Sequence, residues 1–222
     1  AKLSLLLSAK SFYAVSLNVL FFGKLQSLCK NKKLWRLIEM NSIINLKSLV
    51  EGKTTYPSWT TGSVYPLKVE ENGSSALIYY TIKTNKRISR LFPKEIILSP
   101  KLTYMLGLLK GEGSNALGKS NYRRLTITNS NPDIISLILD ELERSDLFKK
   151  SDLIAKSVHL LHHTEPDGKV IEYWSNVLDI PKNKFKCFDD KLKTSKYGVC
   201  HVYISDVLLR RVIDILQTHI TS

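Results

Sequence analysis

The sequence predicts an α+β fold, and three local patterns carry that prediction. First, residues 64–70 and 75–84 are rich in β-branched and aromatic residues and flank Asn72-Gly73, a pair typical of hairpin turns. Second, Ser99-Pro100 and Asn131-Pro132 each place a capping side chain before a proline, as at the start of a helix. Third, apolar and polar residues alternate in 122–130 and 199–205, which indicates half-buried strands.

The first part of the chain is expected to mix helices with one hairpin. Apolar residues recur at helical spacing in 3–50, which predicts two or three helices, the last including Ile43, Ile44 and Leu46. Residues 51–65 are rich in Gly, Thr, Pro and Ser and are expected to form a loop before the hairpin. A basic stretch, 83–90, follows it.

The second part of the chain has a clearer order of elements. A helix is predicted from Pro100 to about Lys110, and a second one from Pro132 through the apolar residues to Leu142. A short helix over 172–178 and a last helix, capped by Asp206 and ending near Ile220, follow. The predicted strands are 115–119, 122–129, 153–162, 184–188 and 198–205. The expected order is α-β-β-α-β-(α)-β-β-α.

The charge of the chain is large and unevenly distributed. The net charge is +13 and the pI is about 9.6, which favours a polyanionic partner, either nucleic acid or an anionic membrane surface, although a basic enzyme without such a partner would also fit. Residues 1–98 hold 15 Lys and Arg against 5 Asp and Glu, and residues 99–222 hold 18 against 15. We therefore predict two domains, a basic region 1–97 that suits an accessory DNA-binding module, and 98–222.

The cysteines and the hydropathy pattern bear on the compartment. Three cysteines without a CxxC pair predict neither a disulfide framework nor a zinc knuckle, and they favour a reducing, intracellular location over secretion. The apolar segment 3–22 is interrupted by Lys10 and several polar residues, so a buried helix is expected there and no membrane span.

The segment 104–114 carries the most specific pattern. Gly107 and Gly111 are four residues apart and share one helical face, where glycine allows two helices to approach closely. Glu112 follows at the negative end of the helix, a favourable place for a divalent cation. If two copies of the helix cross at a two-fold axis, two Glu112 carboxylates converge for two-metal phosphodiester chemistry. The alternative is a helix that ends in a glycine cap, with Glu112 as a solvated surface acid.

This segment resembles the motif of the LAGLIDADG homing endonuclease family. Residues 105–113 align with the nine motif positions, and Gly-Glu-Gly-Ser at 111–114 matches a common variant letter for letter. The family core is αββαββα, in agreement with the elements expected after residue 97. Residues 128–133, 197–200 and 206–211 also look like the family, and the resemblance covers about 97–220.

The resemblance implies roles for particular residues. Glu112 would be the metal ligand for Mg²⁺ (or Mn²⁺), with help from the Gly111 carbonyl, and Lys196 would support catalysis. Lys110 replaces the first motif acid, which leaves cleavage activity uncertain. A chain with one motif must pair with a second copy, so a C2 homodimer is expected. Its expected interface residues are Gly107, Leu108 and Gly111.

Two strands are expected to present a DNA-binding face. Leu125, Ile127, Cys200, Val202 and Ile204 would form the apolar side, and an ordinary sheet with one solvated face would give the same alternation. The opposite side is rich in hydrogen-bond donors suited to a major groove. The expected DNA-binding residues are Lys119, Asn121, Arg123, Arg124, Thr126, Thr128, His201, Tyr203 and Ser205.

Two further groups of residues have simpler explanations. Lys182, Lys184 and Lys186 alternate as on a strand and would contact phosphates or protect a sheet edge. His159, His162 and His163 suggest a metal site, but neither a cysteine nor an acid stands at matching spacing, so strand and loop histidines are expected.

Three functions follow from the resemblance and the charge. The first is Mg²⁺-dependent cleavage of double-stranded DNA by a homodimeric homing endonuclease. The second is a DNA-binding regulator that keeps the fold without catalysis. The third is a maturase that binds its own intron RNA.

Overall fold

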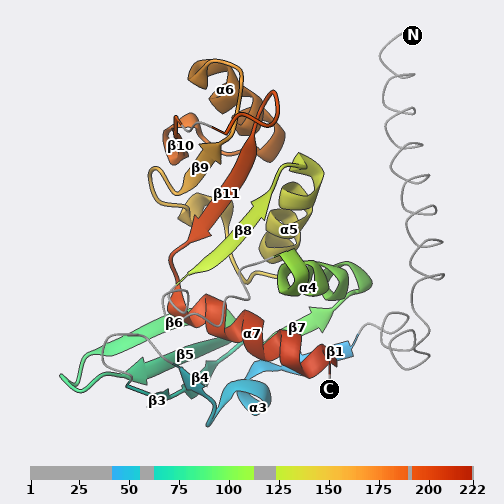
Figure 1. Cartoon of the computed structure of the whole chain (residues 1–222). Helices are drawn as coiled ribbons and strands as arrows, with labels where there is room; N and C mark the ends of the chain where they lie inside the picture. The colour runs from blue at the N-terminus through green and yellow to red at the C-terminus, as the bar shows by residue number, and fades with distance from the viewer. Residues whose placement is uncertain (1–41, 56–62, 113–123, 190–191, 222) are drawn as a thin grey trace. The chain divides into compact units, whose positions relative to one another are not determined.

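A computed structural model gives the structure of the chain (Figure 1), and it describes residues 42–55, 63–112, 124–189 and 192–221. These residues belong to one compact unit, Ser42–Ser222. Its described part has five α-helices and several small, mainly antiparallel sheets, which confirms the α+β prediction. The unit includes residues on both sides of the boundary expected at 97 and 98, and the role expected for 1–97 stays a prediction.

The first described element corrects the helix expected through Ile43 and Ile44. These residues lie in strand β1 (Ser42–Asn45), which pairs antiparallel with β7 (Glu95–Leu98). The Ile44 side chain is 8% exposed and the Ile43 side chain is 64% exposed, as expected for neighbouring residues of a strand. The β-branched side chain of isoleucine also suits extended backbone. A short helix, α3 (Leu46–Val50), follows and is capped by the side chain of Asn45.

The predicted hairpin is confirmed, with a turn one residue further along the chain. Strands β4 (Lys68–Asn72) and β5 (Ser75–Thr81) pair antiparallel, with Asn72 opposite Ser75. Gly73 has φ +58°, a conformation that favours glycine in tight turns. The basic stretch contributes to a third strand, β6 (Arg87–Pro93), which pairs with β5. A short pair, β2 (Thr54–Thr55) with β3 (Tyr65–Pro66), precedes them.

Helix α4 (Pro100–Glu112) begins where Ser99-Pro100 predicts, with the Ser99 hydroxyl accepting a bond from Leu102 N at 3.1 Å. It packs on α5 (Pro132–Arg144), which is capped by Asn131, and on α7 (Val207–Thr221). Asp206 caps α7 as predicted, accepting a bond from Leu209 N at 2.8 Å. The buried side of α4 consists of Leu102, Met105, Leu106 and Leu109.

A four-stranded sheet lies among the helices of the second part (Figure 1), in the order β10-β9-β11-β8. Three strands, β8 (Leu125–Asn129), β11 (Val199–Ile204) and β9 (Val158–Leu161), are antiparallel neighbours. The fourth, β10 (Phe185–Cys187), pairs parallel with β9. Helix α6 (Asp167–Leu178) packs against β10 and α5 and starts earlier than expected. The strand expected at 115–119 lies outside the described residues.

Two sequence expectations in this part of the chain are corrected. The strand expected over 153–162 is shorter, because a 3₁₀ turn (Lys150–Asp152) and irregular backbone precede Val158. Lys182 and Lys184 lie in a second 3₁₀ turn (Lys182–Lys184), where Pro181 O accepts a bond from Lys184 N at 2.9 Å. Lys186 alone of the three lysines is on a strand, so they do not alternate along one edge.

No helix in the described part of the chain combines the length and the apolar character needed to cross a bilayer.

Arg90 joins the three-stranded sheet to the rest of the unit. Its guanidinium pairs with Asp206, donates to Leu147 O at 2.9 Å and lies 3.8 Å from Asp152. The side chains of Arg90 and Asp206 are 21% and 23% exposed, so water screens this pair less than a surface pair.

Replacement of Arg90 by leucine is expected to lower the free energy of unfolding by about 2–4 kcal/mol, because Asp206 and Leu147 O lose a charged donor. Urea denaturation followed by circular dichroism measures the change. Arg87→Leu is the control, because its ion pair with Glu70 is 39% and 53% exposed. Equal loss in both variants would contradict the role given to Arg90.

Candidate nucleic-acid interface

One face of the four-stranded sheet brings together the polar side chains that the alternation predicted. Register pairs His201 with Thr128 and with His159, and Lys186 with His159, so these four residues form one row across the strands. The Thr128 hydroxyl and His201 Nδ1 are 3.0 Å apart and share a hydrogen bond. The opposite face is apolar and buried, as predicted, and contains Leu125, Ile127, Cys200, Val202 and Ile204.

A second group on this face is built around Tyr203. The Arg124 guanidinium lies 4.4 Å from the centre of the Tyr203 ring, and the His159 ring lies 4.6 Å from it on the neighbouring strand. Stacking on an aromatic ring orients a guanidinium and leaves its N–H groups available at the ring's edge. Arg124 and Ser205 are exposed, and Tyr203 is half-buried.

Thr126 requires a correction, because it shares the face and yet is only 8% exposed. It pairs with Tyr203 across the strands. Thr126 therefore does not offer its hydroxyl to a ligand in this structure.

Sequence reasoning missed two residues that extend the face on the strands away from β8. His159 and Lys186 lie in the same row as His201, and both contact Phe188. The ring centres of His159 and Phe188 are 4.7 Å apart, and Lys186 Nζ lies 4.3 Å from the centre of the Phe188 ring. The alternation of apolar and polar residues in β9 could have placed His159 on this face. Lys186 could not be placed there, because no local pattern in the sequence indicates that β10 pairs with β9. In the strands of this sheet as described, the face carries no acidic side chain.

The two histidines of the row are held uncharged. Burial lowers the pKa of His159, and the nearby Lys186 and Arg124 lower it further, against a bond to Lys156 O that raises it. Burial lowers the pKa of His201 as well, followed by repulsion from His159 and His162. Near neutral pH each ring therefore has one donor and one acceptor nitrogen, and one of the two is already used, His159 Nε2 by Lys156 O and His201 Nδ1 by the Thr128 hydroxyl. Each ring leaves its other nitrogen for a ligand.

The free energy of unfolding is expected to fall between pH 7.5 and pH 5. A histidine with a pKa below the usual value near 6.5 is protonated more readily in the unfolded chain. The stability contributed by these rings is therefore complete above pH 6.5 and is lost as the pH falls below it. Urea denaturation at both pH values measures the difference, which should be smaller in His159→Gln/His201→Gln. An unchanged difference in that variant would assign the pH dependence to other groups.

The exposed side of α4 has the character expected of a helix-pairing surface. Gly107 is exposed and Leu108 is partly exposed, and no described atom lies within 4 Å of the position that a Cβ on Gly107 would take. Gly111 and Glu112 are the last two residues of the helix. The surface over Gly107 is thus open to a second helix within the described part of this unit.

The C-terminal half of α4 is joined to α7 by two hydrogen bonds. Gln217 Nε2 donates to Leu106 O at 2.9 Å, and Lys110 Nζ donates to Thr221 Oγ1 at 3.1 Å. The positive charge of Lys110 is thereby directed to the C-terminal turn of α7, where carbonyl groups favour a cation.

Lys196, expected to support catalysis, precedes the N-terminal end of β11, whereas α7 follows the C-terminal end of that strand. Lys196 lies three residues before β11 begins, and its backbone carbonyl accepts a bond from Glu165 N at 3.2 Å. The other end of β11, about 20 Å along the strand, leads to α7, on which α4 packs. Lys196 is therefore not used in the function proposed below. Lys119, Asn121 and Arg123 lie outside the described residues.

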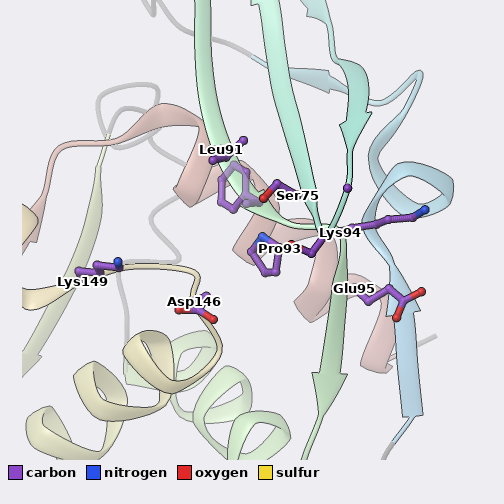
Figure 2. Close-up of a pocket in the computed structure, with 10 residues that line it drawn as sticks. Ser75, Leu91, Pro93, Lys94, Glu95, Asp146 and Lys149 are labelled. Atoms are coloured by element: carbon purple, nitrogen blue, oxygen red, sulfur yellow. The ribbon is translucent and has the colours of Figure 1, made fainter.

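The described residues also line an open cavity of about 860 Å³ (Figure 2). Its lining includes Ser75, Leu91, Pro93, Lys94 and Glu95 on one side and Asp146 and Lys149 on the other, and the Lys94 and Glu95 side chains point away from Asp146 and Lys149. None of the residues of the donor-rich sheet face lines this cavity, so it is separate from the candidate interface.

The two described cysteines are not reactive nucleophiles. Burial, with a contribution from Asp167, raises the pKa of Cys187 to about 11, and burial raises the pKa of Cys200 beyond its usual range. Both are thiols near neutral pH, and the thiolate is the nucleophilic form.

Comparison with known proteins gives no relative: no family model, no curated protein and no solved structure matches the chain.

Proposed function

We propose that the chain is a site-specific, double-stranded DNA endonuclease of the LAGLIDADG type that acts as a homodimer. The observation that carries this proposal is the sheet face of Arg124, Thr128, His159, His201 and Tyr203, whose donors lie in register over an apolar, buried reverse side.

The chemistry of this face suits the major groove of DNA. Arg124 presents a fork of N–H donors that matches guanine acceptors or phosphate, and the hydrogen-bonded pair of neutral His201 and Thr128 keeps one donor and one acceptor for a base edge. Lys186 at the edge of the sheet adds a charge for phosphate contact. Because each phosphate contact releases counterions, binding should weaken steeply as salt rises.

The open side of α4 supports the dimer. Two copies of α4 that cross at Gly107 would relate two sheets by a two-fold axis, and a dimer of this kind reads a roughly palindromic site. The same crossing would bring both Glu112 residues toward one scissile region.

The residue types at the end of α4 suit a hard divalent cation. Glu112 supplies a carboxylate, and the last turn of a helix has carbonyl oxygens without helical partners, including that of Gly111. Mg²⁺ held there would stabilise negative charge on the phosphodiester and increase the acidity of water. Helix α4 would position the metal ion, and the sheet face would bind the DNA.

A second function, DNA binding without cleavage, is favoured by one observation. Lys110 stands where the motif has its first acid, two residues before Glu112, and its amine donates to Thr221 Oγ1. The positive charge of Lys110 would oppose cation binding, and the fold would then act as a regulator.

One selection experiment tests the proposal. Protein is bound to a randomised duplex library in Ca²⁺, and Mg²⁺ is then added to the recovered complexes. A pseudo-palindromic consensus that is cut supports the endonuclease, a consensus that is bound and never cut supports the regulator, and no enrichment overturns both. Arg124→Ala should weaken binding about tenfold or more. Arg87→Ala, whose ion pair with Glu70 is exposed to solvent, is the matched control.

A further inference from the structure

We infer that His163, Asp167 and Cys187 form a zinc site at the end of the four-stranded sheet beside α6. The inference is independent of the proposed DNA binding. His163 follows β9, Asp167 is the first residue of α6, and Cys187 is the last residue of β10. These three elements lie together at one end of the sheet (Figure 1).

The ligand atoms of the three side chains already converge. One nitrogen, one oxygen and one sulfur atom all lie within 4.8 Å of one another, and His163 Nε2 is 3.8 Å from Asp167 Oδ1. In tetrahedral zinc sites, zinc–ligand bonds of about 2.0–2.3 Å place two ligands about 3.3–3.8 Å apart. Small side-chain rotations would therefore complete the site.

The hydrogen bonding of the His163 imidazole leaves its Nε2 atom available to bind a metal. Its Nδ1 lies 3.0 Å from Glu165 O, and because a carbonyl can only accept, Nδ1 carries the proton. Its Nε2 is therefore a lone-pair donor, and it is buried with no hydrogen-bond partner in the structure, in a side chain only 8% exposed. A histidine that donates one N–H to a carbonyl and leaves the other nitrogen free has the usual arrangement of a metal ligand.

The surrounding backbone holds His163 in place. Gly198 has φ +71°, and a Cβ at that position would lie 2.1 Å from Leu161 O and 3.0 Å from His163 N, so glycine is needed for this close approach. Trp174 Nε1 donates to Tyr197 O at 2.8 Å, and the Tyr173 and Tyr197 rings stack with centres 3.8 Å apart. These contacts fix α6, and with it Asp167, against the segment beside Gly198.

The chemistry of the three ligands selects zinc. Imidazole nitrogen, thiolate sulfur and carboxylate oxygen form a set that zinc accepts and that Mg²⁺ or Ca²⁺ does not prefer. Binding transfers the thiol proton of Cys187 to the buffer, and the two negative charges of Cys187 and Asp167 then balance the cation. The Asp167 side chain is 71% exposed, so water can take the fourth position.

Cobalt and zinc titrations of the full chain test the site. Protein is freed of metal with a chelator and titrated with Co²⁺, whose tetrahedral visible bands and thiolate charge-transfer absorption report sulfur ligation. One equivalent should bind and be displaced by Zn²⁺, and Zn²⁺ should raise the Tm by several degrees. Cys187→Ser should abolish the charge-transfer absorption and weaken Zn²⁺ binding about 100-fold.

Two further variants keep the test decisive. Asp167→Asn changes an exposed side chain, so it should fold normally and still weaken Zn²⁺ binding at least tenfold. Cys29→Ser is the matched control and should bind Zn²⁺ as the unchanged chain does. The inference is overturned if the charge-transfer absorption is absent from the unchanged chain, persists in Cys187→Ser, or is lost in Cys29→Ser instead.

Discussion

Replacement of Glu112 by glutamine is expected to abolish DNA cleavage and leave DNA binding nearly unchanged. Glutamine keeps the size of the side chain and removes the negative charge that would hold a divalent cation. Loss of several kcal/mol of charge stabilisation corresponds to a rate about a thousandfold lower. The residues proposed to bind DNA lie on the sheet, so the Kd should change less than threefold. Single-turnover cleavage of the selected duplex and a filter-binding assay measure the two quantities.

The control for this experiment is Glu172→Gln, which removes an exposed acid from α6. It should cleave and bind as the unchanged chain does. If Glu112→Gln cleaves at the original rate, the active-site assignment is wrong. If it loses binding and cleavage together, Glu112 acts in folding or dimerisation and not in catalysis.

Much of the fold could be predicted because its signals are local. Ser99-Pro100 and Asn131-Pro132 predict helix starts that are confirmed, and Asn72-Gly73 predicts a tight turn that is found one residue further along the chain. The alternation in 199–205 also predicts which side chains share a face, because side chains alternate across any strand.

The parts that could not be predicted depend on partners distant in the sequence. The short apolar run that includes Ile43 and Ile44 does not by its spacing separate a helix from a strand, and pairing with β7 decides between them. Likewise, Cys187 lies near His163 because β10 pairs parallel with β9, and no pattern of residues in the sequence predicts that pairing. Asp167 lies only four residues after His163, a spacing at which the sequence alone predicted no metal ligand.

The same limit applies to the candidate site. The alternation of residues along a strand determines which side chains share a face of the sheet, but the surrounding structure determines how exposed each one is. Thr126 therefore lies on the predicted face and is still only 8% exposed. The position of Lys196 depends on strand register, and register places it at the end of β11 away from α7.

Replacement of Gly107 by leucine is expected to have opposite effects on the single chain and on the dimer. Within one chain the site is open, so leucine removes the conformational cost of a glycine in a helix and should add about 0.8 kcal/mol of stability. Between two chains, the added side chain would separate the crossing helices. The dimer dissociation constant should rise at least about 100-fold, and cleavage should be lost with it.

Sedimentation equilibrium and urea denaturation separate the two effects. Lys101→Leu is the matched control, because it places the same side chain at an exposed position in the first turn of α4. It should remain dimeric and active. A more stable, monomeric Gly107→Leu chain supports pairing through α4, because simple damage to the fold would lower stability as well. A Gly107→Leu chain that dimerises as before would place the dimer contact elsewhere, and the convergence of two Glu112 residues would lose its basis.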